Sequence, residues 1–131
     1  MVTRSWSLDA NPTAASHARG LLKEHCAARH PQADPGRLRT ALLLVSELVT
    51  NAVRYGDAPI DLEVVDGKER FRVNVSDHSA VLPVQQDVDL WSEGGRGIML
   101  VESLSSSWGV VEHPGDGKAV WFELPPFVTS A

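Results

Sequence analysis

The chain has 131 residues, of which 43% are apolar and 22% are charged, an ordinary composition for one folded globular domain and not for a disordered chain. Twelve basic against 17 acidic residues give a net charge of −5, which argues against bulk attraction to nucleic acid or anionic lipid. The one cysteine, Cys26, excludes an internal disulfide, and no apolar run has the length of a signal peptide or membrane span. We therefore expect a single cytoplasmic domain over residues 1–131, without nucleic acid or membrane as a partner.

The first half of the chain predicts a strand and two helices. Residues 4–9 have the pattern of a short strand. A cap residue followed by proline predicts a helix start at Asn11-Pro12 and again at Asp34-Pro35. We expect these helices to reach about His30 and about Tyr55. The second helix has apolar residues at helical spacing, which predicts one wide buried face: Leu38, Ala41, Leu42, Val45, Leu48, Val49 and Ala52.

A β-hairpin is predicted around Asp66-Gly67, a strong turn signal between two runs of alternating apolar residues. If the loop has two residues, apolar side chains pair on one face and opposite charges on the other. The expected pairs are then Leu62 with Phe71, Ile60 with Val73, Glu63 with Arg70 and Asp61 with Arg72.

The remaining residues predict a loop, a short helix and a second hairpin. Residues 78–96 are irregular, and a loop of this length in a compact domain is often a functional lid. A short amphipathic helix is expected after Gly97, followed by strands at about 108–113 and 119–124. The complete order predicts an α+β fold, a two-layer sandwich of a mostly antiparallel sheet with helices on one face.

A first candidate site comprises Glu47 and Asn51, which lie four residues apart and therefore share one stripe of the second helix. A carboxylate and a carboxamide oxygen suit a magnesium ion with phosphates as its further ligands. Glu47 could also accept a proton from an attacking hydroxyl group. The alternative is the solvated polar edge of an amphipathic helix.

A second candidate is Asp77, which continues the inward alternation of Phe71, Val73 and Val75. A carboxylate that points inward at a strand end needs hydrogen-bond donors. The exocyclic amine of a purine would be suitable, and so would a backbone N–H in the following turn.

A third candidate is the segment Gly94-Gly95-Arg96-Gly97, which opens the short helix. Glycines let backbone amides approach a phosphate, the helix N-terminus favours negative charge, and Arg96 adds donors. The segment is neither a Walker A loop nor a dinucleotide-binding fingerprint. The alternative is a flexible hinge before a helix.

Taken in order, these segments resemble the ATP-binding domain shared by gyrase, heat-shock chaperones, histidine kinases and mismatch-repair ATPases. Within that superfamily the sequence is most similar to the small bacterial anti-sigma factor serine kinases. The segments that carry the resemblance are 43–53 (an N box), 75–79 with Pro83 (a first glycine box), 94–98 with Leu100-Val101 (a second glycine box), and the ending 108–110, 117–118 and 120–124.

The resemblance implies the Bergerat ATP-binding fold and a serine/threonine kinase that uses ATP and Mg²⁺. It implies that such a protein binds a sigma factor, has an antagonist protein as phosphoacceptor, and could form a homodimer. It also implies roles for individual residues. These are Glu47 as base, Asn51 as magnesium ligand, Asp77 on the adenine amine with Ser79 also in the nucleotide site, and Gly94, Gly95, Arg96 and Gly97 around the phosphates.

Two positions depart from the pattern of the superfamily. Ser79 stands where a glycine lets the backbone approach adenine, and Ala119 stands where related chains often have a threonine. These departures leave open a second reading, a nucleotide-binding interaction module that transfers no phosphate. A third reading, the catalytic half of a histidine kinase, is disfavoured because no dimerisation hairpin with a phosphoacceptor histidine precedes the domain in this sequence.

Overall fold

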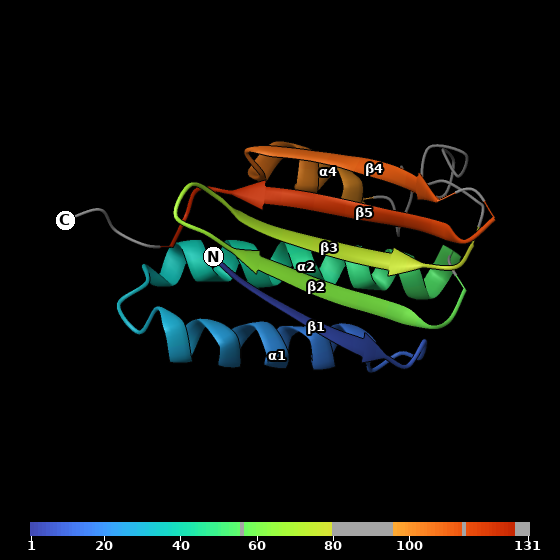
Figure 1. The fold of residues 1–131 in the computed structure, drawn as a ribbon, viewed down its shortest axis with the longest axis horizontal. Helices are drawn as coiled ribbons and strands as arrows, with labels where there is room; N and C mark the ends of the chain where they lie inside the picture. Colours follow the sequence, from blue (N-terminus) through green and yellow to red (C-terminus); the bar gives the residue numbers. More distant parts are fainter. Residues whose placement is uncertain (56, 80–95, 114, 128–131) are drawn as a thin grey trace.

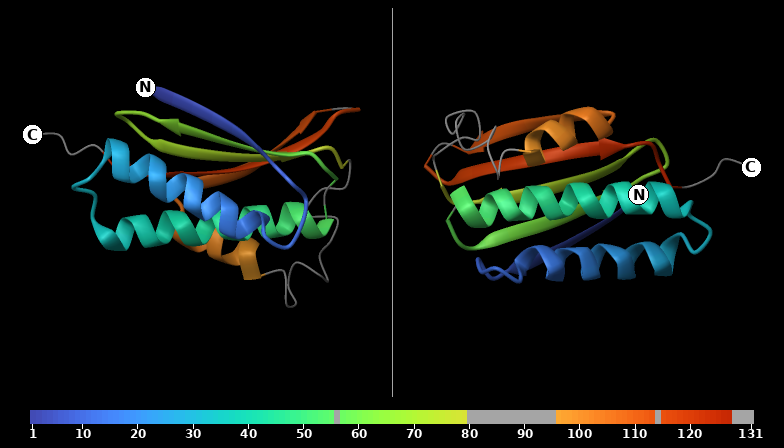
Figure 2. Two further views of the ribbon diagram at one scale, coloured as in Figure 1. Left: turned by 90° about the horizontal axis from the view of Figure 1, so that it is seen from below. Right: turned by 180° about the vertical axis from the view of Figure 1, so that it is seen from behind.

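The structure is a two-layer α+β sandwich (Figure 1). The computed structural model describes residues 1–55, 57–79, 96–113 and 115–127. Its elements are β1 (Val2–Leu8), α1 (Ala14–Arg29), α2 (Pro35–Tyr55), β2 (Ile60–Asp66), β3 (Phe71–Asp77), α4 (Arg96–Leu104), β4 (Ser107–His113) and β5 (Gly117–Leu124). The described strands form one antiparallel sheet in the order β1-β2-β3-β5-β4. The described helices all lie on one face of this sheet (Figure 2), so the predicted fold class is confirmed.

Of the two predicted helix starts, the structure confirms the one at α2 and moves the one at α1, and the first strand is Val2–Leu8 instead of 4–9. At α2, Asp34 Oδ2 accepts a hydrogen bond of 3.1 Å from the Arg37 backbone N–H, which confirms the predicted cap. At α1, Asn11 Oδ1 instead accepts from the Thr13 backbone N–H at 2.9 Å, and the helix begins only at Ala14. Asn11 therefore stabilises a turn before the helix, because its side chain bonds the backbone two residues on.

The core lies between the sheet and the helices. Alternate residues of β2 and β3 point inward with essentially no exposure, and the apolar stripe of α2 packs on them. The largest fully buried apolar side chains are Phe71, Phe122, Leu22, Leu44, Ile60 and Leu62. Among the described helices none combines the length and the apolar character that a membrane span requires.

The pairing register of the β2–β3 hairpin differs from the predicted one. Asp66 pairs with Phe71, Val64 with Val73 and Leu62 with Val75, so the loop comprises the four residues 67–70. The predicted pairs, which assumed a two-residue loop, are wrong. The predicted faces are right, because the register differs by an even number of positions and each side chain keeps its side of the sheet.

Burial of Asp66 accounts for the longer loop. Asp66 Oδ2 accepts hydrogen bonds from Nε2 of His25 at 2.8 Å and from Nε2 of His30 at 2.6 Å, and Arg29 Nε lies 3.4 Å away. The Asp66 side chain is 1% exposed, so these contacts compensate a charge that would otherwise be costly to bury. Keeping Asp66 in β2 extends the strand to the residue just before Gly67.

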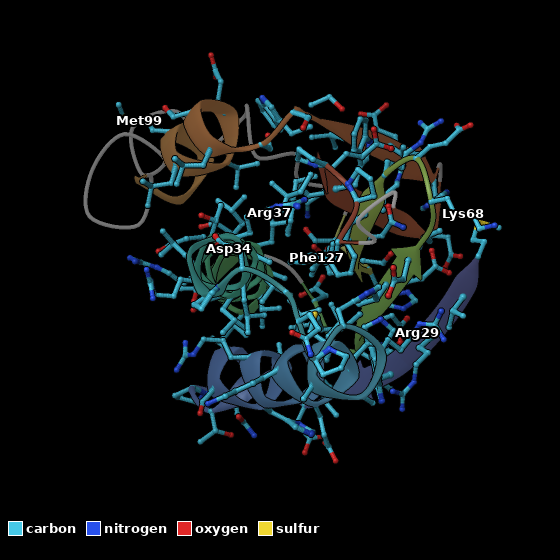
Figure 3. All side chains as sticks on the ribbon, turned by 90° about the vertical axis from the view of Figure 1, so that its left-hand side faces the viewer. Arg29, Asp34, Arg37, Lys68, Met99 and Phe127 are labelled. Carbon is cyan, nitrogen blue, oxygen red and sulfur yellow. The ribbon has the colours of Figure 1, made fainter. Side chains whose placement is uncertain are left out.

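Phe127 closes the same end of the molecule, where Figure 3 shows it between α2 and the sheet. Its ring packs edge-on against Phe71, with 4.7 Å between centroids, and stacks on His30 at 5.7 Å. The Arg37 guanidinium lies 5.1 Å from the centre of the Phe127 ring. Aromatic side chains therefore pack at this end, and Asn51 and Asp77 lie toward the opposite end.

Candidate nucleotide-binding site

The candidate site lies where α2 ends, β3 ends and β5 begins, at one end of the sandwich (Figure 1). The His78 backbone N–H donates to the Asp57 carbonyl oxygen at 3.0 Å, which ties the end of β3 to the segment after α2. Asp77 pairs with Lys118 in the β3–β5 ladder. The last turns of α2 and the inner face of these strand ends thus meet at one place.

On α2, Glu47 and Asn51 lie one turn apart, as predicted. Glu47 is half-buried, and Asn51 is 9% exposed. Both polar atoms of the Asn51 amide, Nδ2 and Oδ1, are buried without a hydrogen-bond partner among the described residues. Buried amides are almost always paired, and an unpaired one costs about 1–3 kcal/mol. The unpaired Asn51 oxygen therefore fits the oxygen ligand that a magnesium ion requires.

At the end of β3, Asp77 points inward with 4% exposure, so the predicted direction of its side chain is confirmed. Its Oδ1 accepts a hydrogen bond of 2.8 Å from the Ser79 backbone N–H. The same oxygen accepts from Lys118 Nζ at 3.0 Å. The Ser79 N–H is a backbone donor in the following turn, which the sequence suggested as the alternative to a purine amine. Both of these hydrogen bonds use Asp77 Oδ1, and neither uses Asp77 Oδ2.

Lys118, which the sequence placed only in the family-like ending 117–118, is a further candidate site residue. It is 4% exposed and lies on the inner face of β5, in phase with Val120, Phe122 and Leu124. The preceding Gly117 has φ +95°, and a Cβ there would collide with the Asp77 carbonyl oxygen. Gly117 therefore lets β5 begin close against the end of β3, which brings the Lys118 ammonium to the Asp77 carboxylate.

The phosphate-binding segment is described only in part. Gly94 and Gly95 lie outside the described residues, as does most of the predicted lid. The backbone of Arg96 and Gly97 forms the first turn of α4, two residues earlier than expected. The helix packs against α2, with Val101 fully buried. Helix α4 thus packs on the helix that carries Glu47 and Asn51, and the role of the glycines stays a prediction.

The residues of α1 that could ligate a metal do not form one group. His25 and Cys26 are buried, whereas His17 is exposed on another face. Burial, together with the nearby charge of Asp66, raises the pKa of the Cys26 thiol to about 12, so that it stays protonated at neutral pH. Across the residues that the structure describes, no three His, Cys, Asp or Glu side chains are grouped to hold a metal ion.

Comparisons with known proteins identify the family. The family model for the histidine kinase-like ATPase domain matches residues 8–124, and the chain belongs to this family. No curated protein sequence matches the chain significantly. Among solved structures, the chain is similar to the crystal structure of the RsbU and RsbW domains of Rv1364c from Mycobacterium tuberculosis, with 23% sequence identity and a TM-score of 0.71. The match covers 98% of this chain and 35% of that one, so the chain spans about a third of the length of that protein.

Membership in this family implies that the chain binds ATP. The similarity to the Rv1364c structure extends over the whole sandwich and supports the fold. The residues Glu47, Asn51 and Asp77 all lie within the matched range 8–124, on the elements that meet at one end of the sheet.

Proposed function

We propose that the protein is an ATP-dependent serine/threonine kinase of the anti-sigma factor type. In this proposal it binds Mg²⁺ and ATP at the α2–β3–β5 end, phosphorylates an antagonist protein and sequesters a sigma factor. The observation that carries the proposal is the Asn51 amide, which is buried and unpaired one turn after a half-buried carboxylate. Family membership supports ATP as the nucleotide. The sigma factor and the antagonist protein are proposed from the sequence resemblance.

Each site residue has a distinct task in this proposal. Asn51 Oδ1 is the protein oxygen for the magnesium ion, which would neutralise phosphate charge when bound. Glu47 accepts the proton of the attacking serine hydroxyl group. Asp77 accepts a hydrogen bond from the adenine amine, with Ser79 beside it. Gly94 to Gly97 surround the phosphates at the start of α4.

The test compares phosphotransfer in the wild type and in Glu47→Gln. A pull-down of cytoplasmic proteins with this protein, with and without Mg-ATP, identifies the partners. Radiolabelled ATP then measures the transfer of phosphate to those partners. Glu47→Gln should lower the transfer rate by about 10²–10⁴, the usual contribution of a general base, and change ATP affinity by less than about tenfold. Glu69→Gln, on the exposed turn at the opposite end, is the matched control and should leave both unchanged.

A second function is a nucleotide-gated binding module without phosphotransfer. One observation favours it: in the described part of the chain, no hydrogen bond or ion pair orients the Glu47 carboxylate, although bases of this kind are usually held in position by a further group. Partner binding that depends on Mg-ATP, without any transfer that depends on Glu47, would support the module and contradict the kinase.

A further inference from the structure

The ion pair between Asp77 and Lys118 lies inside the proposed nucleotide site. Lys118 Nζ lies 3.0 Å from Asp77 Oδ1, and the two side chains are 5% and 3% exposed. Lysine is among the residues least often buried, and burial of its ammonium is costly unless a carboxylate compensates it. The charged lysine is therefore a fixed part of the surroundings of the proposed base-binding carboxylate.

After these contacts, and within the described residues, Asp77 still has a free acceptor oxygen and Lys118 still has free N–H donors. Asp77 Oδ1 already accepts from the Ser79 N–H and from Lys118, which uses both of its lone pairs. Asp77 Oδ2 has no hydrogen-bond partner among the described residues. The Lys118 ammonium has three N–H donors, and within the same part of the chain only one of them is used, on Asp77.

We propose that Lys118 contacts the base directly, donating a hydrogen bond to adenine N1 while Asp77 Oδ2 accepts one from the N6 amine. This inference rests on the proposed ATP-binding function. Adenine presents a donor at position 6 next to an acceptor at position 1. The pair presents an acceptor next to a cationic donor, which is the complementary order.

The same pair rejects 6-oxopurines. Guanine and hypoxanthine have an acceptor, O6, at position 6 and an N–H donor at position 1. In the same pose, O6 would face the Asp77 carboxylate and the N1–H would face the Lys118 ammonium. The first contact sets two acceptors against each other and the second sets two donors against each other, and sites of this kind discriminate strongly. Lys118 therefore reads the base in addition to neutralising Asp77.

Nucleotide analogues test the contact without any change to the protein. In 1-deaza-ATP a C–H group replaces N1, so the acceptor for Lys118 is absent and the amine for Asp77 remains. Calorimetric titrations in the presence of Mg²⁺ should show that the wild type binds 1-deaza-ATP about 10- to 100-fold more weakly than ATP, the loss expected for one charge-assisted hydrogen bond. Inosine triphosphate should bind more weakly still.

A set of lysine variants assigns the effect. Lys118→Met should bind ATP and 1-deaza-ATP with equal affinity, and Lys118→Arg should keep the difference between them. Lys68→Met removes the same charge from the exposed turn at the other end of the molecule (Figure 3) and should behave as the wild type.

Equal affinity of the wild type for ATP and 1-deaza-ATP would overturn the base contact. Tighter binding of ATP by Lys118→Met would also overturn it, because the lysine would then only compete with adenine for Asp77. In both outcomes ATP binding itself, and with it the proposed function, would stand. If the wild type binds none of these nucleotides, the proposed function falls and this inference falls with it.

Discussion

Replacing Asp77 with asparagine should destabilise the fold as well as the nucleotide site. The substitution keeps the shape of the side chain but removes the charge that compensates Lys118. At the observed 3.0 Å, Coulomb attraction in an effective dielectric of about 20 amounts to about 5.5 kcal/mol. The Lys118 side chain is only 5% exposed, so its ammonium group remains desolvated when the Asp77 charge is removed. We expect Asp77→Asn to lower the free energy of unfolding by about 3–5 kcal/mol, the range for removing one partner of a buried ion pair.

The assay is urea-induced unfolding at pH 7, followed by circular dichroism and extrapolated linearly to zero urea. The double variant Asp77→Asn with Lys118→Met should recover most of the lost free energy, because no charge is then left buried alone. Arg70→Met is the matched control, since it breaks a pair of 3.4 Å with Glu123 in which the arginine is 59% exposed. Such an exposed pair should contribute less than about 1 kcal/mol.

Two results would refute this reasoning. One is a free energy of unfolding of Asp77→Asn within about 1 kcal/mol of the wild type, the typical effect of an ordinary substitution. The other is a double variant that is as unstable as the sum of its two single variants, because the two charges would then be energetically independent.

Two further predictions concern the opposite end of the molecule. Asp66→Ala leaves the Nε2–H groups of His25 and His30 unpaired and should lower the free energy of unfolding by about 2–6 kcal/mol, at about 1–3 kcal/mol for each buried donor. The control Asp61→Ala, at an exposed position on the same strand, should change the free energy of unfolding by less than about 0.5 kcal/mol. Equal effects of the two substitutions would contradict the stabilising role of the Asp66 contacts. Cys26 should not react with iodoacetamide in the folded protein, because its pKa is raised to about 12, and rapid labelling at pH 8 without urea would contradict its burial. Since the unfolded thiol loses its proton near pH 9 and the folded one only near pH 12, this group lowers stability as the pH rises between these values.

Most of the fold could be predicted because its signals are local. The Asp34-Pro35 start of α2, the helical spacing of its apolar residues and the alternation in β2 and β3 each involve residues close in sequence. The register of the β2–β3 hairpin could not be predicted in the same way. It depends on Asp66 reaching His25, 41 residues earlier in the chain, and a turn signal contains no information about that contact.

The positions of the candidate site residues could also be predicted from local signals. Glu47 and Asn51 share a stripe by helix geometry, and Asp77 points inward by strand phase, so each could be placed from its own element. Lys118 also had a signal, since the alternation of Val120, Phe122 and Leu124 puts it on the inner face. What the sequence lacked was the register between β3 and β5, which alone pairs Lys118 with Asp77.

The most direct test of the account is a calorimetric titration of Mg-ATP into the wild type and into Asn51→Ala. The account predicts binding by the wild type that requires Mg²⁺, and an affinity lower by about tenfold or more in Asn51→Ala, because the protein oxygen for the metal is lost. The variant should fold normally, since truncation removes a buried amide whose two polar atoms have no partner among the described residues. Asn51→Asp, which keeps an oxygen at this position, should bind more tightly than Asn51→Ala. Equal Mg-ATP affinity in the wild type and Asn51→Ala would contradict the account.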